Sequence, residues 1–181
     1  DVVALLTENN LHAFEVYWAA LRSGLYVTAV NHHLAPGEVG YIVDDSGAKA
    51  LIVSAGKAEL ATQVAGAAGL KLAFDGPVDG YGSYDDALAA ASDVPFDDQP
   101  YGATMLYSSG TTGRPKGVRP MLSGAQVDDP GDSLGGLAGQ FFGVNPDAVY
   151  LSPAPIYHAA PLRWSGAVQA HGGTVVMMRR F

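Results

Sequence analysis

Residues 107–118 read Tyr107-Ser108-Ser109-Gly110-Thr111-Thr112-Gly113-Arg114-Pro115-Lys116-Gly117-Val118. Glycines let backbone N–H groups approach an anion closely, hydroxyls can donate to phosphate oxygens, and a lysine adds a positive charge. The stretch therefore predicts a phosphate clamp with these candidate binding residues: Ser108, Ser109, Gly110, Thr111, Thr112, Gly113 and Lys116. Residues 103–107 have the apolar composition of a buried strand, so the clamp is expected at a strand end, where α/β sheets hold ligands.

The spacing distinguishes this clamp from other phosphate loops. Gly110, Gly113 and Lys116 stand in the order G-x-x-G-x-x-K, which is not the G-x-x-x-x-G-K-[S/T] of a Walker A loop. A glycine-rich surface turn is the simpler alternative, but turns seldom carry four hydroxyls and a lysine in this arrangement. As a whole, the stretch resembles the phosphate-binding signature of the AMP-forming adenylating enzymes. This superfamily includes acyl-CoA synthetases, luciferases and the adenylation domains of peptide synthetases.

A second stretch, Pro155-Ile156-Tyr157-His158, resembles a motif of acyl- and aryl-CoA synthetases. In that branch the motif places an aromatic residue and a histidine beside the carboxylate that is activated, and a histidine can donate a hydrogen bond to a carboxylate or an acyl phosphate. The resemblance implies catalytic roles for Lys116 and His158, and substrate contacts for Tyr157, His158 and Trp164. A core or helix-capping histidine, and a tryptophan on a helix face packed in the core, are the alternatives.

The same motif bears on the substrate. Amino-acid adenylation domains present an aspartate here to pair with the α-ammonium, because a buried ammonium needs a counter-charge. Tyr157 and His158 offer none, so the resemblance implies a fatty, aryl or steroid-like carboxylic acid. It further implies acyl-AMP formation from ATP, then transfer to CoA, with magnesium held by residues outside this sequence. A non-catalytic nucleotide-binding or regulatory module that keeps the clamp is the alternative.

Apolar periodicity predicts alternating strands and helices, and hence an α/β fold with a mainly parallel sheet covered by helices. We expect strands over 2–6, 26–30, 49–53, 70–74, 104–107, 148–152 and 174–178, and helices over 11–21, from 36 onward, and over 59–68, 84–91, 133–143 and 162–170. Asp45-Ser46-Gly47-Ala48-Lys49 also resembles the superfamily, which implies part of the large N-terminal domain of an acyl-CoA synthetase.

The amino-acid composition argues against several other classes of protein. The net charge of −8 argues against a nucleic-acid or anionic-membrane surface, which needs clustered Lys and Arg. The absence of cysteine removes disulfides and zinc–thiolate sites. No apolar run approaches the length of a membrane span and no signal peptide is evident, so a cytoplasmic protein with small-molecule partners is expected, with a homo-oligomer possible.

Both ends of the sequence lie directly beside strand-like runs. We therefore expect residues 1–181 to be a partial N-terminal domain, with the phosphate loop at 107–118 and the acyl-site motif at 155–158. The C-terminal domain with its catalytic lysine, and the family's magnesium and ribose motifs, are not found. The chain alone is expected to be inactive, with apolar surface exposed or paired in an oligomer.

Three further expectations concern local features. Asn9 and Asn10 are plausible helix caps. His32 and His33 are interpreted as ordinary surface residues whose side chains point apart, rather than as a metal pair. Residues 119–132 combine prolines, glycines and aspartates and are expected to be mobile without a ligand.

Overall fold

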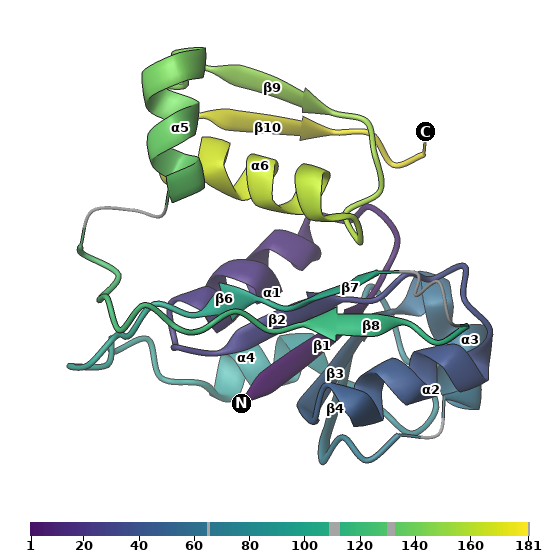
Figure 1. Ribbon diagram of the computed structural model, residues 1–181. Helices are drawn as coiled ribbons and strands as arrows, with labels where there is room; N and C mark the ends of the chain where they lie inside the picture. The colour runs from purple at the N-terminus through teal and green to yellow at the C-terminus, as the bar shows by residue number, and fades with distance from the viewer. Residues whose placement is uncertain (65, 109–112, 130–132, 181) are drawn as a thin grey trace.

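The computed structural model describes residues 1–64, 66–108, 113–129 and 133–180, which form two packed units (Figure 1). The larger unit is built on a six-stranded parallel sheet with the order β5-β4-β3-β1-β2-β6. Its strands are β1 (Val2–Leu6), β2 (Tyr26–Ala29), β3 (Ala48–Ser54), β4 (Leu70–Phe74), β5 (Gly82–Ser83) and β6 (Ala103–Thr104). The predicted α/β class with a mainly parallel sheet is confirmed.

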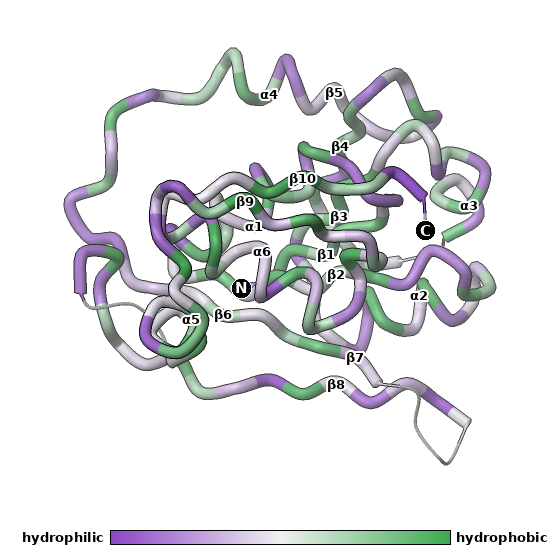
Figure 2. The backbone as a smooth tube through the Cα atoms, turned by 90° about the horizontal axis from the view of Figure 1, so that it is seen from above, coloured by the Kyte–Doolittle hydropathy of each residue, from purple (hydrophilic) through white to green (hydrophobic). Residues whose placement is uncertain are grey.

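Helices cover both faces of this sheet. They are α1 (His12–Leu21), α2 (Pro36–Asp45), α3 (Ala58–Gln63) and α4 (Tyr84–Ala90), with a 3-10 turn over Ala55–Lys57. Successive strand side chains point to opposite faces, so Leu6 of β1 packs with α2 and α3 whereas Leu5 packs with α1 and α4. Figure 2 accordingly shows hydrophobic stretches along the central strands. Burial on both faces explains why these strands read as apolar runs.

The smaller unit contains α5 (Ser133–Phe142), β9 (Val149–Ser152), α6 (Ala159–Ala170) and β10 (Thr174–Met177). Strands β9 and β10 pair in parallel. Helix α6 lies between this pair and the larger unit (Figure 1). It buries Leu162 in the same core cluster as α1, and Trp18 Nε1 donates a 2.7 Å hydrogen bond to Gln169 Oε1. The contact between α1 and α6 therefore joins the two units.

One face of the β9–β10 pair remains open to solvent. Val149 is 72% exposed, Leu151 56% and Val176 48%. The strand expected over 174–178 is present as β10, and the expected exposed apolar surface is present as well. Among the helices of the described residues, none has the length and apolarity to cross a membrane.

The predicted strand over 104–107 is divided between two sheets. The Met105 amide still donates to Val27 O at 2.9 Å, but the next residues leave β2. They form β7 (Leu106–Ser108), which pairs antiparallel with β8 (Lys116–Val118), a strand that the sequence did not predict. Strands β7 and β8 thus form a hairpin that extends from the edge of the sheet.

The segment after the hairpin is tied to the larger unit as far as Val127, whose amide donates to Gln99 O at 3.0 Å. Tyr26 donates from its hydroxyl to Pro120 O at 2.7 Å, and the Arg119 guanidinium lies 4.3 Å from the centroid of the Tyr26 ring. The Tyr101 amide donates to Ala125 O at 2.7 Å. These contacts hold the segment against the larger unit, and its mobility without a ligand stays a prediction; residues 130–132 lie outside the described chain.

Candidate nucleotide and carboxylate site

The β7–β8 hairpin presents the described part of the predicted phosphate clamp. Ser108 lies directly opposite Lys116, and both are exposed. Gly113 has φ of +97°, a conformation that L side chains rarely adopt, so glycine is required there. Both ion pairs found among the described residues involve His12, so the Lys116 ammonium is unpaired within that part of the chain. The candidates Ser109, Gly110, Thr111 and Thr112 lie outside the described residues.

A cavity of about 680 Å³ brings the two sequence motifs together. The end of β2 and the start of α2 form one wall, the hairpin a second, and residues 157–159 a third. Its described lining includes Asn31, Tyr107, Ser108, Gly113, Tyr157 and His158. Lys116 is placed on the adjacent strand and is not among the lining residues. Two stretches about fifty residues apart in the sequence therefore face one space.

His158 is the residue that precedes α6, in an extended conformation. Its side chain is exposed and makes no capping hydrogen bond. Both alternatives for this residue, a core histidine and a capping histidine, are therefore wrong. The His158 ring centroid lies 4.5 Å from that of Tyr157, so both rings are presented to the cavity side by side.

The structure adds two histidines that sequence reasoning set aside. The ring centroids of His32 and His33 are 4.3 Å apart, and they lie 5.3 and 6.2 Å from that of Tyr157. The expectation that these side chains point apart is wrong, because the residues lie in a turn after β2 rather than in a strand. Burial, followed by the positive charge of Lys57, lowers the pKa of His32 to about 4.

Asn9 fixes the loop that carries the Tyr157-His158 motif. Its Oδ1 accepts a 2.9 Å hydrogen bond from the Ile156 amide, and its Nδ2 donates to Ala154 O at 3.2 Å and Met178 O at 2.8 Å. The predicted capping role is wrong for Asn9, whereas Asn10 Oδ1 does accept from the His12 amide at 3.0 Å. The available signal for Asn9 was a polar segment, residues 7–10, that follows a buried strand.

Trp164 lines a second, largely apolar cavity of about 600 Å³ rather than the first. Its ring centroid lies 5.0 Å from that of Phe142, in an edge-to-face contact. Ala159 lines both cavities, so they adjoin. Leu162, on the same helix, is buried in the core and takes no part in either.

A third cavity, of about 990 Å³, carries positive charge. Its charged lining residues are Lys57, Arg179 and Arg180 against one carboxylate, that of Glu8, and His32 and His33 also line it. Such a set suits a phosphate or carboxylate group. Within the described ranges, no group of three or more His, Asp or Glu side chains could hold a metal ion.

The parallel α/β sheet, the glycine-rich hairpin at its edge and the shared cavity define an α/β domain of the adenylate-forming class. The AMP-binding enzyme family matches residues 1–181, so this chain belongs to that family.

Individual relatives of known name support this family assignment. The chain is 32% identical to 4-coumarate–CoA ligase 3 of Oryza sativa subsp. japonica and 28% identical to the fatty acid–[acyl-carrier-protein] ligase ScoC of Streptomyces coeruleorubidus. Both matches cover 100% of this chain, but only 33% of the length of the first relative and 34% of the second. ATP-bound MatB of Rhodopseudomonas palustris is 29% identical with a TM-score of 0.71, covering 100% of this chain and 35% of MatB. The chain thus spans about a third of these relatives, and the predicted resemblance to acyl- and aryl-CoA ligases is confirmed.

Proposed function

We propose that this chain provides the phosphate-binding and carboxylate-binding parts of an ATP-dependent acid–thiol ligase. The observation that carries the proposal is the cavity in which the β7–β8 hairpin faces Tyr157 and His158. Such a ligase must bring a carboxylate to the phosphates of ATP, and one space bounded by both motifs provides that proximity.

In the first step, a carboxylate oxygen of the acid attacks the α-phosphorus of ATP. The bond to the β-phosphate breaks, giving acyl-AMP and pyrophosphate. Ser108 and Lys116, with the hydroxyls and backbone of residues 109–113, would hold the β- and γ-phosphates and stabilise the charge that develops on the pyrophosphate. His158 would donate a hydrogen bond to the reacting carboxylate, and Tyr157 would position the acid beside it.

In the second step, the sulfur of CoA attacks the acyl carbonyl carbon and AMP leaves. The cationic cavity beside His33, Lys57 and Arg179 suits the phosphates of CoA. A carrier protein is the competing acceptor, since one relative is named a fatty acid–[acyl-carrier-protein] ligase. No cluster of side chains among the described residues fits a magnesium ion.

The proposed acid has no α-amino group, because Tyr157 and His158 present no carboxylate to pair with an ammonium. The adjoining apolar cavity with Trp164 suits the body of a fatty, aryl or steroid-like acid. We propose that residues 1–181 are part of a larger N-terminal domain and that the chain alone does not turn over, because it spans about a third of its relatives. A non-catalytic nucleotide-binding module remains the second candidate, favoured by the same clamp.

The test is calorimetry on the 181-residue chain with ATP and with non-hydrolysable acyl-AMP analogues that carry a long-chain or an aryl acid. Binding of ATP and of at least one analogue, the latter weakened by His158→Ala, is the expected result. Binding of ATP with no preference for an analogue over AMP would favour the nucleotide-binding module. Binding of neither would contradict the proposal. A parallel assay of CoA thiol consumption should detect no product, and any turnover would contradict the proposed inactivity.

A further inference from the structure

The carboxylate at the end of α2 contacts the hairpin directly. Tyr107, on β7, donates from its hydroxyl to Asp45 Oδ2 at 2.6 Å, across 62 residues of sequence. Asp45 Oδ1 accepts a second hydrogen bond, of 3.2 Å, from the hydroxyl of Tyr41 one helical turn earlier. One carboxylate therefore binds two phenol groups, one from its own helix and one from the strand that leads to Ser108.

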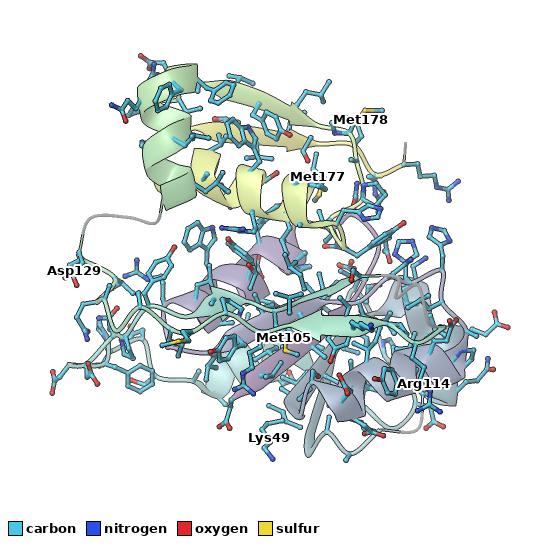
Figure 3. The ribbon with its side chains drawn as sticks, viewed as in Figure 1. Lys49, Met105, Arg114, Asp129, Met177 and Met178 are labelled. Atoms are coloured by element: carbon cyan, nitrogen blue, oxygen red, sulfur yellow. The ribbon has the colours of Figure 1, made fainter. Side chains whose placement is uncertain are left out.

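The returning arm of the hairpin reaches the same network. The guanidinium of Arg114 lies 5.3 Å from the centroid of the Tyr41 ring, a cation–π distance. Figure 3 shows Arg114 beside α2. Because the Tyr41 hydroxyl is bound to Asp45, the ring under Arg114 is held by that carboxylate. Both arms of the hairpin thus connect to Asp45, one directly and one through Tyr41.

Tyr107 is also fixed from its other side. A Cβ atom added at Gly117 would lie 2.8 Å from Tyr107 Cζ, which means that the ring packs on the bare backbone of β8. Burial, followed by the neighbouring Asp45 carboxylate, raises the pKa of Tyr107, so its hydroxyl remains a donor. The ring is therefore held between the β8 backbone and the end of α2.

We propose that Asp45 is a positioning residue that fixes both arms of the phosphate hairpin through Tyr107, Tyr41 and Arg114. It holds Ser108 and Lys116 in register for a nucleotide triphosphate without touching the nucleotide itself. The inference rests on the proposed function insofar as the hairpin binds phosphate. Holding the arms before binding reduces the ordering cost that would otherwise weaken affinity.

The direction in which ATP affinity changes when Asp45 is removed distinguishes a positioning role from a charge effect. A carboxylate near an anion site repels the anion, so a role based on charge alone predicts that removing Asp45 strengthens ATP binding. A positioning role predicts the opposite. For Asp45→Ala, which removes both acceptors, we expect ATP affinity in calorimetry to fall by about tenfold, in line with the loss of hydrogen bonds to a charged group.

The conservative variant should restore binding. An asparagine can bond both hydroxyls, accepting from one and donating to the oxygen of the other, so Asp45→Asn should bind ATP at least as tightly as the original chain. Asp44→Asn is the matched charge control: it removes the adjacent charge and keeps the acceptor for the Ala67 amide, now 2.9 Å from Asp44 Oδ1. Tyr107→Phe should resemble Asp45→Ala, and combining the two should add little further loss.

Equal or tighter ATP binding by Asp45→Ala would overturn the inference, as would failure of Asp45→Asn to restore it. Amide hydrogen exchange provides a readout independent of ATP. Asp45→Ala should speed exchange in residues 106–108 and 116–118 while leaving β1 and β3 protected, and unchanged exchange in the hairpin would overturn the inference. Absence of ATP binding by the original chain would instead contradict the proposed function, and the exchange experiment would still decide the role of Asp45.

Discussion

Asn9 Oδ1 accepts a 2.9 Å hydrogen bond from the amide of Ile156, a residue 147 positions later in the chain. Asn9 is buried in the loop that follows β1, and Ile156 is buried directly before the Tyr157-His158 motif. The loop that follows β1 in the larger unit thereby sets the position of the histidine loop in the smaller unit. The same amide group also binds the carbonyl of Met178, beyond β10.

Asn9→Ala should therefore lower the free energy of unfolding by about 2–3 kcal/mol, because it leaves the buried Ile156 amide and the carbonyls of Ala154 and Met178 without their partner. Urea unfolding measures the loss, and exchange of the Ile156 amide reports whether the loop has loosened. Asn10→Ala is the control, since its side-chain contacts are more exposed. Similar losses for the two variants would contradict the special role of Asn9.

Gly117→Ala should destabilise the hairpin by about 1–3 kcal/mol, a typical cost of overpacking. The added methyl would lie 2.7 Å from Met105 Cε and 2.8 Å from Tyr107 Cζ. Gly136→Ala is the matched control: it lies in α5, nothing surrounds its Cβ position within 4 Å, and alanine favours a helix by up to about 1 kcal/mol. Thermal unfolding of both variants checks the contrast, and a neutral Gly117→Ala would show that Tyr107 can move away freely.

Much of the fold was predictable because the residues that begin and end its strands are evident in the local sequence. Strands 2–6 and 70–74 were predicted to the residue, since each is an apolar run bounded by polar or glycine residues. The run over 103–107, in contrast, has no polar or glycine residue at Met105, where the chain leaves β2 and enters the hairpin. The change of sheet at Met105 depends on which strand, β2 or β8, accepts and donates the backbone hydrogen bonds. Strand β8, Lys116-Gly117-Val118, is too short and polar to be predicted from its own composition.

The two motifs of the candidate site were likewise evident from residue types, but the residues that hold them were not. Asp45 and His32 act on segments distant in sequence, Tyr107 and Tyr157 respectively. Nothing local distinguishes such a carboxylate or imidazole from a solvated one. Their partners become visible when the sheet brings the ends of α2 and β2 beside the hairpin and the histidine loop.

His12 should make stability depend on pH near neutrality. Its Nδ1 lies 2.8 Å from Glu15 Oε2 and its Nε2 3.5 Å from Asp75 Oδ1. The hydrogen bond to Glu15, opposed by partial burial and aided by the charges of Glu15 and Asp75, raises the pKa of His12 above 6.5. The stabilisation is therefore complete below pH 6.5 and is lost as the pH rises through the folded pKa. The original chain should melt at a higher temperature than His12→Gln at low pH, and this difference should shrink as the pH rises above 6.5. A difference that stays constant with pH would contradict the pairing of His12 with Glu15 and Asp75.

His32 should show the opposite dependence. Its folded pKa of about 4 lies below the ordinary 6.5, so the unfolded chain binds the proton more readily. The contribution of neutral His32 is present above pH 6.5 and is lost as the pH falls from 6.5 toward 4. The melting temperature of the original chain should fall more steeply over this window than that of His32→Gln. NMR titration of the His32 ring provides a direct check, and a midpoint near 6.5 would contradict the buried, neutral state.

Lys116→Ala should weaken ATP binding without altering the fold. Lys116 is exposed on β8 and has no carboxylate partner among the described residues, so its removal should change the free energy of unfolding by less than about 0.5 kcal/mol. In a ligase that contains this chain, loss of its charge should cost on the order of 3 kcal/mol of transition-state stabilisation, about a hundredfold in ATP–pyrophosphate exchange. Lys49→Ala, an exposed lysine remote from the hairpin in Figure 3, is the control and should leave exchange unchanged. An exchange rate for Lys116→Ala equal to that of the control would refute the phosphate role of the hairpin lysine.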